Sequence, residues 1–332
     1  MIPPNAAMTM RTTAEPPVRK PRFLWWIASA IATACLVFFL RSFDFRTALN
    51  EIAGAEIGWI LVAIAANFAA LPLLTEQWSR LLPAARPIRW SVLWDCVTLG
   101  IAAMNTLPFG GGHAVAVGML AKRGASGMQG AVSLMALEQL CDAFAKLALL
   151  LVALAVAPLP AMLHRVTWIL AAAIVIGFFF LLWLARHPGK ISPSNGWRAK
   201  WGRHLEVLKK PRVFVAAVAL SLMMKVVAAV AIYAVQRSLG IDLPVTTAPF
   251  VLAVVTFATL VAVAPGNFGV YEAAAFAAYR WLGVPAGDAA ALGLVQHACF
   301  LVPLVGTGYV LTVWRTIFPA RKPPAQLSES SE

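Results

Sequence analysis

The sequence predicts an all-α polytopic membrane protein with about eight hydrophobic segments. Of its 332 residues, 61% are hydrophobic and only 12% are charged, and the mean hydropathy is +0.78. A chain of this composition must bury most of its surface in lipid rather than in a soluble core. The net charge of +13 does not indicate a nucleic-acid partner, because the basic residues lie mainly in the loops between apolar runs.

The apolar runs divide the chain into three parts. Residues 1–22 form a basic N-terminal segment, residues 23–314 form a single transmembrane domain, and residues 315–332 form a short tail. Most runs reach the roughly 17 to 25 residues that a helix needs to cross a bilayer. The runs are 23–40, 57–74, 91–107, 130–157, 166–185, 213–236, 245–282 with an interruption, and 288–313.

The distribution of Lys and Arg decides how these segments are oriented. If every run crossed the membrane, loop 186–212 with its eight basic residues would lie outside, against the positive-inside rule. The conflict disappears if 91–121 and 245–282 are re-entrant hairpins, the first entered from the cytoplasm and the second from outside. Cytoplasmic segments then carry 20 basic residues and exterior segments 5.

This count favours six full spans plus two opposed re-entrant broken hairpins, with both termini in the cytoplasm. The membrane would be a bacterial-type inner membrane. The alternative is a plain topology of eight spans, because residues 91–107 are long enough to cross unaided.

The two hairpins also suggest an inverted repeat, in which a span, a hairpin and a second span recur upside down. The chain distance from Gly112 to Gln139 is 27 residues, and the distance from Gly269 to Gln296 is the same. Many transporters form a midplane site around such paired broken helices. The alternative is coincidence, because two segments of similar composition can match this well by chance.

Each hairpin is interrupted by a group of proline and glycine residues. Non-helical backbone at membrane depth is tolerated only where it is buried in protein or lines a cavity. We therefore expect these residues to act as helix breaks or hinges around a substrate site. They are Pro108, Gly110, Gly111 and Gly112 in the first hairpin and Pro265, Gly266 and Gly269 in the second.

Ionisable residues within the spans are the candidate substrate contacts. Each costs roughly 2.5–3.5 kcal/mol at the bilayer centre, so such residues normally face a bundle interior or a wet cavity. Glu138, Asp142 and Lys146 stand at i, i+4 and i+8 and therefore share one stripe of a helix. In the alternative, Asp142 pairs with Lys146, Glu138 pairs with Lys225 on another helix, and both pairs only lock the bundle.

Two further candidates follow the breaks. Glu272 lies three residues after Gly269, where the positive end of the returning helix favours a carboxylate. It is either a plain cap or a contact for a cationic or hydroxylated head group. His113 follows Gly112 in the first hairpin and is either structural or a ligand or proton carrier. Weaker candidates for the same lining are Asp95, Asn105, Gln296 and His297.

The four cysteines lie in apolar runs and form no Cys-x-x-Cys pair. Neither a disulfide framework nor a zinc site is indicated, so we expect no metal and no cofactor.

The second break and its surroundings resemble the lysylphosphatidylglycerol synthase transmembrane family, a group of flippase-like integral membrane proteins. Pro265 to Ala273 followed by Leu282-Gly283-Val284-Pro285 is similar to the family signature, and 107–114 and 137–142 are similar to its other two blocks. The resemblance covers roughly residues 20–315. It implies a protein that translocates or helps present a lipid or lipid-linked head group, with anionic or modified membrane lipids as partners.

Two departures from the family pattern affect this expectation. The family commonly has an acidic residue after the first glycine break, often with an arginine nearby, whereas this chain has Gly110 and His113 there. Only 18 residues follow Trp314, so the soluble aminoacyl-transferase domain, and hence enzyme activity, is not expected. The alternatives are a scaffold or accessory subunit of a lipid-modifying or glycosyl-transferring enzyme and an ion-coupled small-solute carrier.

Overall fold

The computed structural model describes residues 53–82, 88–107, 111–123, 127–156, 161–186, 206–260 and 265–317. Every regular element in these ranges is a helix, which confirms the predicted all-α fold. The first predicted span, 23–40, lies outside the described residues, as do Pro108 and Gly110.

The helices follow one another in two similar series. The first consists of α3 (Ile57–Leu81), α4 (Trp90–Thr106), α5 (Gly111–Lys122) and α6 (Gly127–Val156). The second consists of α9 (Pro211–Ser238), α10 (Thr247–Ala258), η2 (Pro265–Asn267), α11 (Val270–Trp281) and α12 (Ala286–Ile317). Between them lie α7 (Ala161–Arg186) and the short turn η1 (Glu206–Lys209). Each series thus contains a long helix, a pair of shorter helices and a second long helix, the order that the predicted repeat requires.

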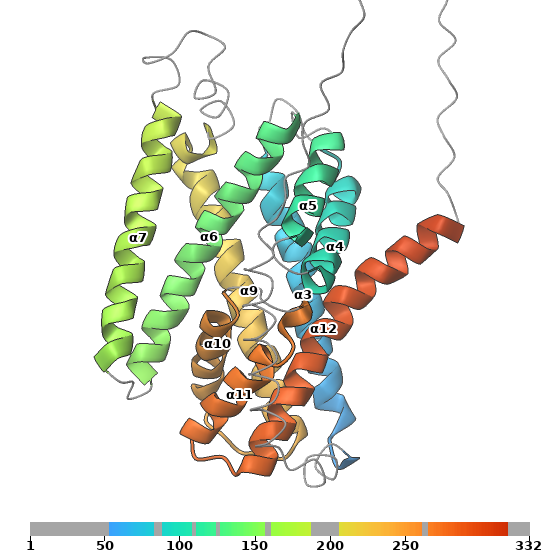
Figure 1. Cartoon of the computed structure of the whole chain (residues 1–332), viewed down its shortest axis with the longest axis vertical. Coiled ribbons are helices and arrows are strands. Elements are labelled where there is room, and N and C mark those ends of the chain that lie inside the picture. The colour runs from blue at the N-terminus through green and yellow to red at the C-terminus, as the bar shows by residue number, and fades with distance from the viewer. Residues whose placement is uncertain are drawn as a thin grey trace, which may run out of the picture.

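The paired shorter helices lie toward opposite ends of the long axis of the molecule (Figure 1). Helices α4 and α5 pack together at one end, and α10 and α11 pack together at the other. The long helices α3, α9 and α12 run between these ends. The two hairpins are therefore opposed, as the sequence predicts.

Among the described residues, α3, α9 and α12 are long and apolar enough to cross a membrane. Helix α6 has 30 residues but carries a carboxylate pair and a lysine near its middle. Helix α7 exposes large apolar side chains such as Trp168, Ile176 and Phe179. An apolar exterior with charges in the interior is the pattern of a bundle embedded in lipid.

Two glycines allow α4 to pack closely against neighbouring helices. A Cβ added to Gly112 of α5 would lie 2.2 Å from backbone atoms of Met104 in α4. A Cβ added to Gly308 of α12 would lie 2.5 Å from the Cβ of Ala102, which is also in α4. Small residues allow helix backbones in membranes to approach this closely. Helix α4 is therefore packed tightly against both α5 and α12.

The second hairpin is interrupted by left-handed backbone. Gly266 has φ 59°, Asn267 has φ 53° and Gly269 has φ 82°. Such conformations cannot continue an α-helix, and glycine adopts them at little cost. Helix α10 accordingly ends at Ala258, and α11 begins only after Gly269, so the predicted interruption is present.

A buried carboxylate ties the end of α12 to the first hairpin. Asp95 of α4 is only 3% exposed. Its Oδ2 accepts a hydrogen bond of 2.9 Å from Nη1 of Arg123, just after α5, and also pairs with Arg315 in the last turn of α12. One side chain thus connects three elements.

Replacing Asp95 by alanine is expected to lower the free energy of unfolding by about 1–3 kcal/mol, because Arg123 loses a charge-assisted hydrogen bond and Arg315 loses its ion-pair partner. The matched control is Glu76→Ala, which removes an exposed pair with Arg80 and should cost less than about 1 kcal/mol. Thermal unfolding of the full-length variants in detergent measures both. Equal losses would show that Asp95 does not connect the three elements.

Candidate functional site

A central cavity of about 390 Å³ lies between the two hairpins. Its wall includes Asn105 and His113 from the first hairpin and Gly266 and Tyr271 from the second. Helices α3, α6, α9 and α12 complete the lining. The volume falls in the range of roughly 300–1,000 Å³ that is typical of ligand sites.

The cavity lies where the predicted repeat would place a substrate site. Gln139 of α6 and Gln296 of α12, the two residues at equal distance from Gly112 and Gly269, both line it. Asn105, one of the weaker candidates, also lines it. Asp95 and His297 are not part of the lining and are buried, at 3% and 1% exposure.

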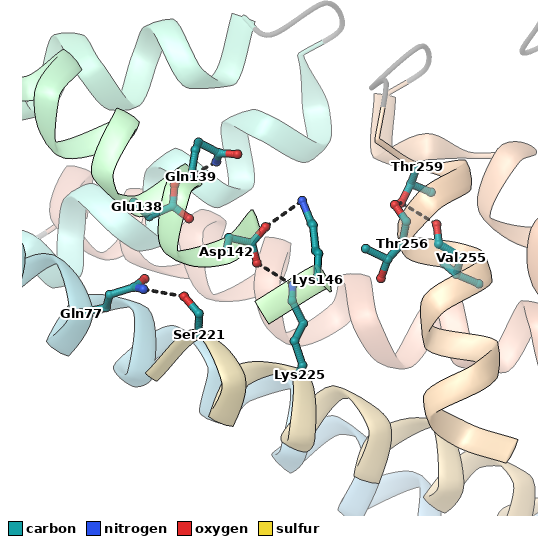
Figure 2. A network of polar contacts seen from close by, with 10 residues as sticks. All are labelled: Gln77, Glu138, Gln139, Asp142, Lys146, Ser221, Lys225, Val255, Thr256 and Thr259. Atoms are coloured by element: carbon teal, nitrogen blue, oxygen red, sulfur yellow. Dashed lines mark hydrogen bonds and ion pairs between the residues drawn. The ribbon is translucent and has the colours of Figure 1, made fainter. Parts of the chain in front are cut away.

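A cluster of three charged side chains lines one wall of this cavity (Figure 2). Asp142 Oδ2 lies 2.7 Å from Lys146 Nζ of the same helix, and Asp142 Oδ1 lies 2.7 Å from Lys225 Nζ of α9. Both carboxylate oxygens are therefore engaged by lysine. The alternative pairing of Lys225 with Glu138 is wrong, because Lys225 reaches across to Asp142 instead.

Glu138 lies one turn from Asp142 but faces a different space. Its Oε2 accepts a hydrogen bond of 2.8 Å from Nε2 of Gln139, and the residue is 9% exposed. It lines a separate hollow of about 40 Å³ beside Trp78 and Val97. The structure therefore brings Asp142, Lys146 and Lys225 together in the cavity wall, whereas Glu138 is not part of that wall.

Glu272 makes the contacts of a helix cap. Its Oε2 accepts a hydrogen bond of 2.7 Å from the backbone N–H of Gly269, and its Oε1 lies 2.7 Å from Nδ1 of His297. The residue is 4% exposed and is not part of the cavity lining. Of the two roles considered for it, the capping contacts are the ones present.

A second polar network connects this cap to the cavity wall. The His297 ring stacks on Tyr271, with ring centroids 4.2 Å apart and planes 9° apart. The hydroxyl of Tyr271 accepts a hydrogen bond of 2.8 Å from Nε2 of Gln296. The hydroxyl of Tyr279 in turn donates a hydrogen bond of 2.9 Å to Oε1 of Gln296. The break at Gly269 is thus linked through His297 to a residue that lines the cavity.

The break residues divide between the cavity and the packing around it. Gly266 lines the cavity, whereas Gly112 lies in the first turn of α5 and packs on α4. Gly111 begins α5, Pro265 begins η2, and Gly269 is the N-cap of α11. A hinge role for these residues stays a prediction.

Sequence reasoning did not single out Asn67 and Tyr271 as lining residues. Asn67 is 7% exposed and donates from Nδ2 to the carbonyl oxygens of Ala63 and Cys299, which connects α3 to α12. A signal for it was available, since an amide inside an otherwise apolar run is costly without partners. Tyr271 gave a weaker signal, because a tyrosine next to the break also suits interfacial anchoring.

Opposed broken hairpins around a cavity that holds charged side chains define an integral membrane protein, and many transporters share this arrangement. The chain belongs to the family described as the lysylphosphatidylglycerol synthase TM region, whose model matches residues 25–308. This confirms the resemblance and places the protein among membrane proteins associated with lipid modification or translocation. No curated protein matches the sequence.

Proposed function

We propose that this protein translocates a lipid or lipid-linked head group across the inner membrane, or helps to present it at one face. The observation that carries the proposal is the central cavity, which places charged side chains inside a bundle with an apolar exterior. Charges at membrane depth usually mark a substrate pathway. Membership of a family associated with lipid modification or translocation supports the same proposal.

The size of the cavity supports a division of the cargo between protein and lipid. About 390 Å³ accommodates a polar head group but not two long acyl chains. The tails would remain in the bilayer while the head group passes through the protein. The protein would therefore act as a lipid translocase rather than an enzyme, and a lipid-modifying enzyme that supplies the cargo is the expected protein partner.

The charged cluster supports lipid handling over an ion-coupled carrier. A cation-coupled carrier would need a site with excess negative charge. The cluster instead has two ammonium groups, of Lys146 and Lys225, against the single carboxylate of Asp142. For orientation, the opposed hairpins together with the positive-inside distribution favour cytoplasmic termini.

Vesicles containing the purified protein and a lipid labelled on the head group test the proposal. Wild type is expected to move the label between leaflets faster than empty vesicles. Asp142→Ala is expected to slow this at least tenfold, because Lys146 and Lys225 lose the group that positions them. Glu76→Ala, an exposed acid on α3, is the control and should behave as wild type. A wild-type rate equal to that of empty vesicles would refute lipid movement.

A further inference from the structure

We infer that Lys146 and Lys225 form a phosphate-binding fork, with Asp142 as the internal counterion that holds the two lysines between ligands. The inference rests on the proposed function and names the chemistry of the head group that the cavity receives: the phosphate of a phospholipid.

The balance of charges in the cluster decides whether it attracts a cation or an anion. Each oxygen of Asp142 has a lysine nitrogen at 2.7 Å, and the other carboxylate of α6, Glu138, lines the separate hollow rather than the cavity. Two ammonium groups against one carboxylate leave a positive charge without a partner in the cluster. The cluster therefore repels a cation and attracts an anion.

The lysines also keep hydrogen-bonding capacity for a ligand. An ammonium group has three N–H donors, and the contact with Asp142 uses one donor of each lysine. Both side chains line the cavity and are partly exposed, Lys146 at 23% and Lys225 at 21%. The unused donors are therefore accessible from the cavity.

The spacing of the two lysines suits a phosphate. They already contact the two oxygens of one carboxylate, and two oxygens of a phosphate are similarly spaced. Lysine binds phosphate as a point charge, so the contact does not need a fixed planar geometry. When the site is empty, Asp142 keeps the two ammonium groups from remaining unpaired at membrane depth.

The rest of the wall favours a phospholipid over a soluble phosphate. Across the cavity from the lysines, Figure 2 shows Thr256 of α10 and Thr259 at its C-cap, and the cavity lining also includes the apolar side chains of Ile232 and Val255. A glycerol backbone with the first acyl carbons can contact such a mixed wall, whereas inorganic phosphate cannot. Of the other titratable residues in the wall, His113 lies on the opposite hairpin and Tyr271 is hydrogen-bonded to Gln296.

Equilibrium binding to the full-length protein in a phosphate-free detergent tests the fork. The probes are a short-chain phosphatidylglycerol, a diacylglycerol with the same chains and no phosphate, and glycerol 3-phosphate. Phosphatidylglycerol is expected to bind at least tenfold more tightly than either of the others. Lys146→Gln and Lys225→Gln are each expected to weaken its binding about tenfold, because each removes a charge-assisted contact. Lys122→Gln, at an exposed position of α5, is the matched control and should have no effect.

Asp142→Asn separates this site from a receptor for cations. The fork predicts that this variant binds phosphatidylglycerol as tightly as wild type or more tightly. The amide oxygen of asparagine can still accept a hydrogen bond from a lysine, as alanine cannot, while the competing negative charge is gone. Thermal unfolding checks that the variant is folded. Loss of binding in Asp142→Asn with unchanged binding in both lysine variants would overturn the proposal. Equal affinity for the diacylglycerol would also overturn it, and equal affinity for glycerol 3-phosphate would overturn the lipid assignment.

The vesicle assay distinguishes failure of the fork from failure of the proposed function. If wild type binds phosphatidylglycerol selectively but moves no lipid, the fork stands and translocation is wrong. If the double variant Lys146→Gln, Lys225→Gln moves phosphatidylglycerol as fast as wild type, translocation stands and the fork is wrong.

Discussion

Replacing Gly112 by alanine is expected to force α5 away from α4 and to destabilise the protein by about 1–3 kcal/mol or more. The added Cβ would lie 2.2 Å from the N and Cα atoms of Met104. These are backbone atoms within α4 and cannot rotate away as a side chain would. The hairpin must therefore open, and His113 in the cavity wall would move with it.

Gly118→Ala provides the control for this result. Gly118 lies on the same helix, and no atom lies within 4 Å of a Cβ built there. The Gly118→Ala variant is expected to be as stable as wild type or slightly more stable. Thermal unfolding of both variants in detergent makes the comparison. A stability for Gly112→Ala equal to that of Gly118→Ala would mean that the close approach of α5 and α4 does not hold the hairpin.

Replacing Glu272 by alanine is expected to cost about 2–5 kcal/mol, because two buried groups lose their partner. The N–H of Gly269 and Nδ1 of His297 both contact this carboxylate, and neither lies where water can replace it easily. We expect lower thermal stability and weaker lipid movement together, since the break between α10 and α11 loses its cap.

Glu272→Gln separates the capping role from a role for the charge. The amide oxygen of glutamine can accept the hydrogen bond from Gly269, and its NH₂ group can donate to Nδ1 of His297. A cap predicts that Glu272→Gln keeps most stability and activity while Glu272→Ala loses both. Equal loss of lipid movement in both variants, with Glu272→Gln stable, would indicate instead that the charge contacts the head group.

The helices could be predicted from the sequence because a bilayer leaves few other solutions. Backbone groups in lipid must be paired within the segment, so long apolar runs become helices wherever proline and glycine allow it. The break after α10 was predictable for the same reason, since Gly266 and Gly269 have conformations that end a helix. These features depend on local chemistry alone.

The partner of Lys225 could not be predicted, because it depends on how α9 lies against α6. Glu138 and Asp142 were both within reach of a lysine on a neighbouring helix. Successive i, i+4 positions rotate by roughly 40° around a helix with 3.6 residues per turn, so a stripe of three residues does not face one direction. Asp142 faces the cavity and Lys225, and Glu138 faces the smaller hollow.

The stacked pair of Tyr271 and His297 has a consequence for how the second hairpin could respond to cargo. Tyr271 borders the cavity, and His297 contacts the Glu272 carboxylate, which accepts a hydrogen bond from the amide of Gly269. A head group that displaced the phenol ring would therefore disturb the cap as well. Binding of a head group in the cavity and movement of the break between α10 and α11 would then be coupled directly.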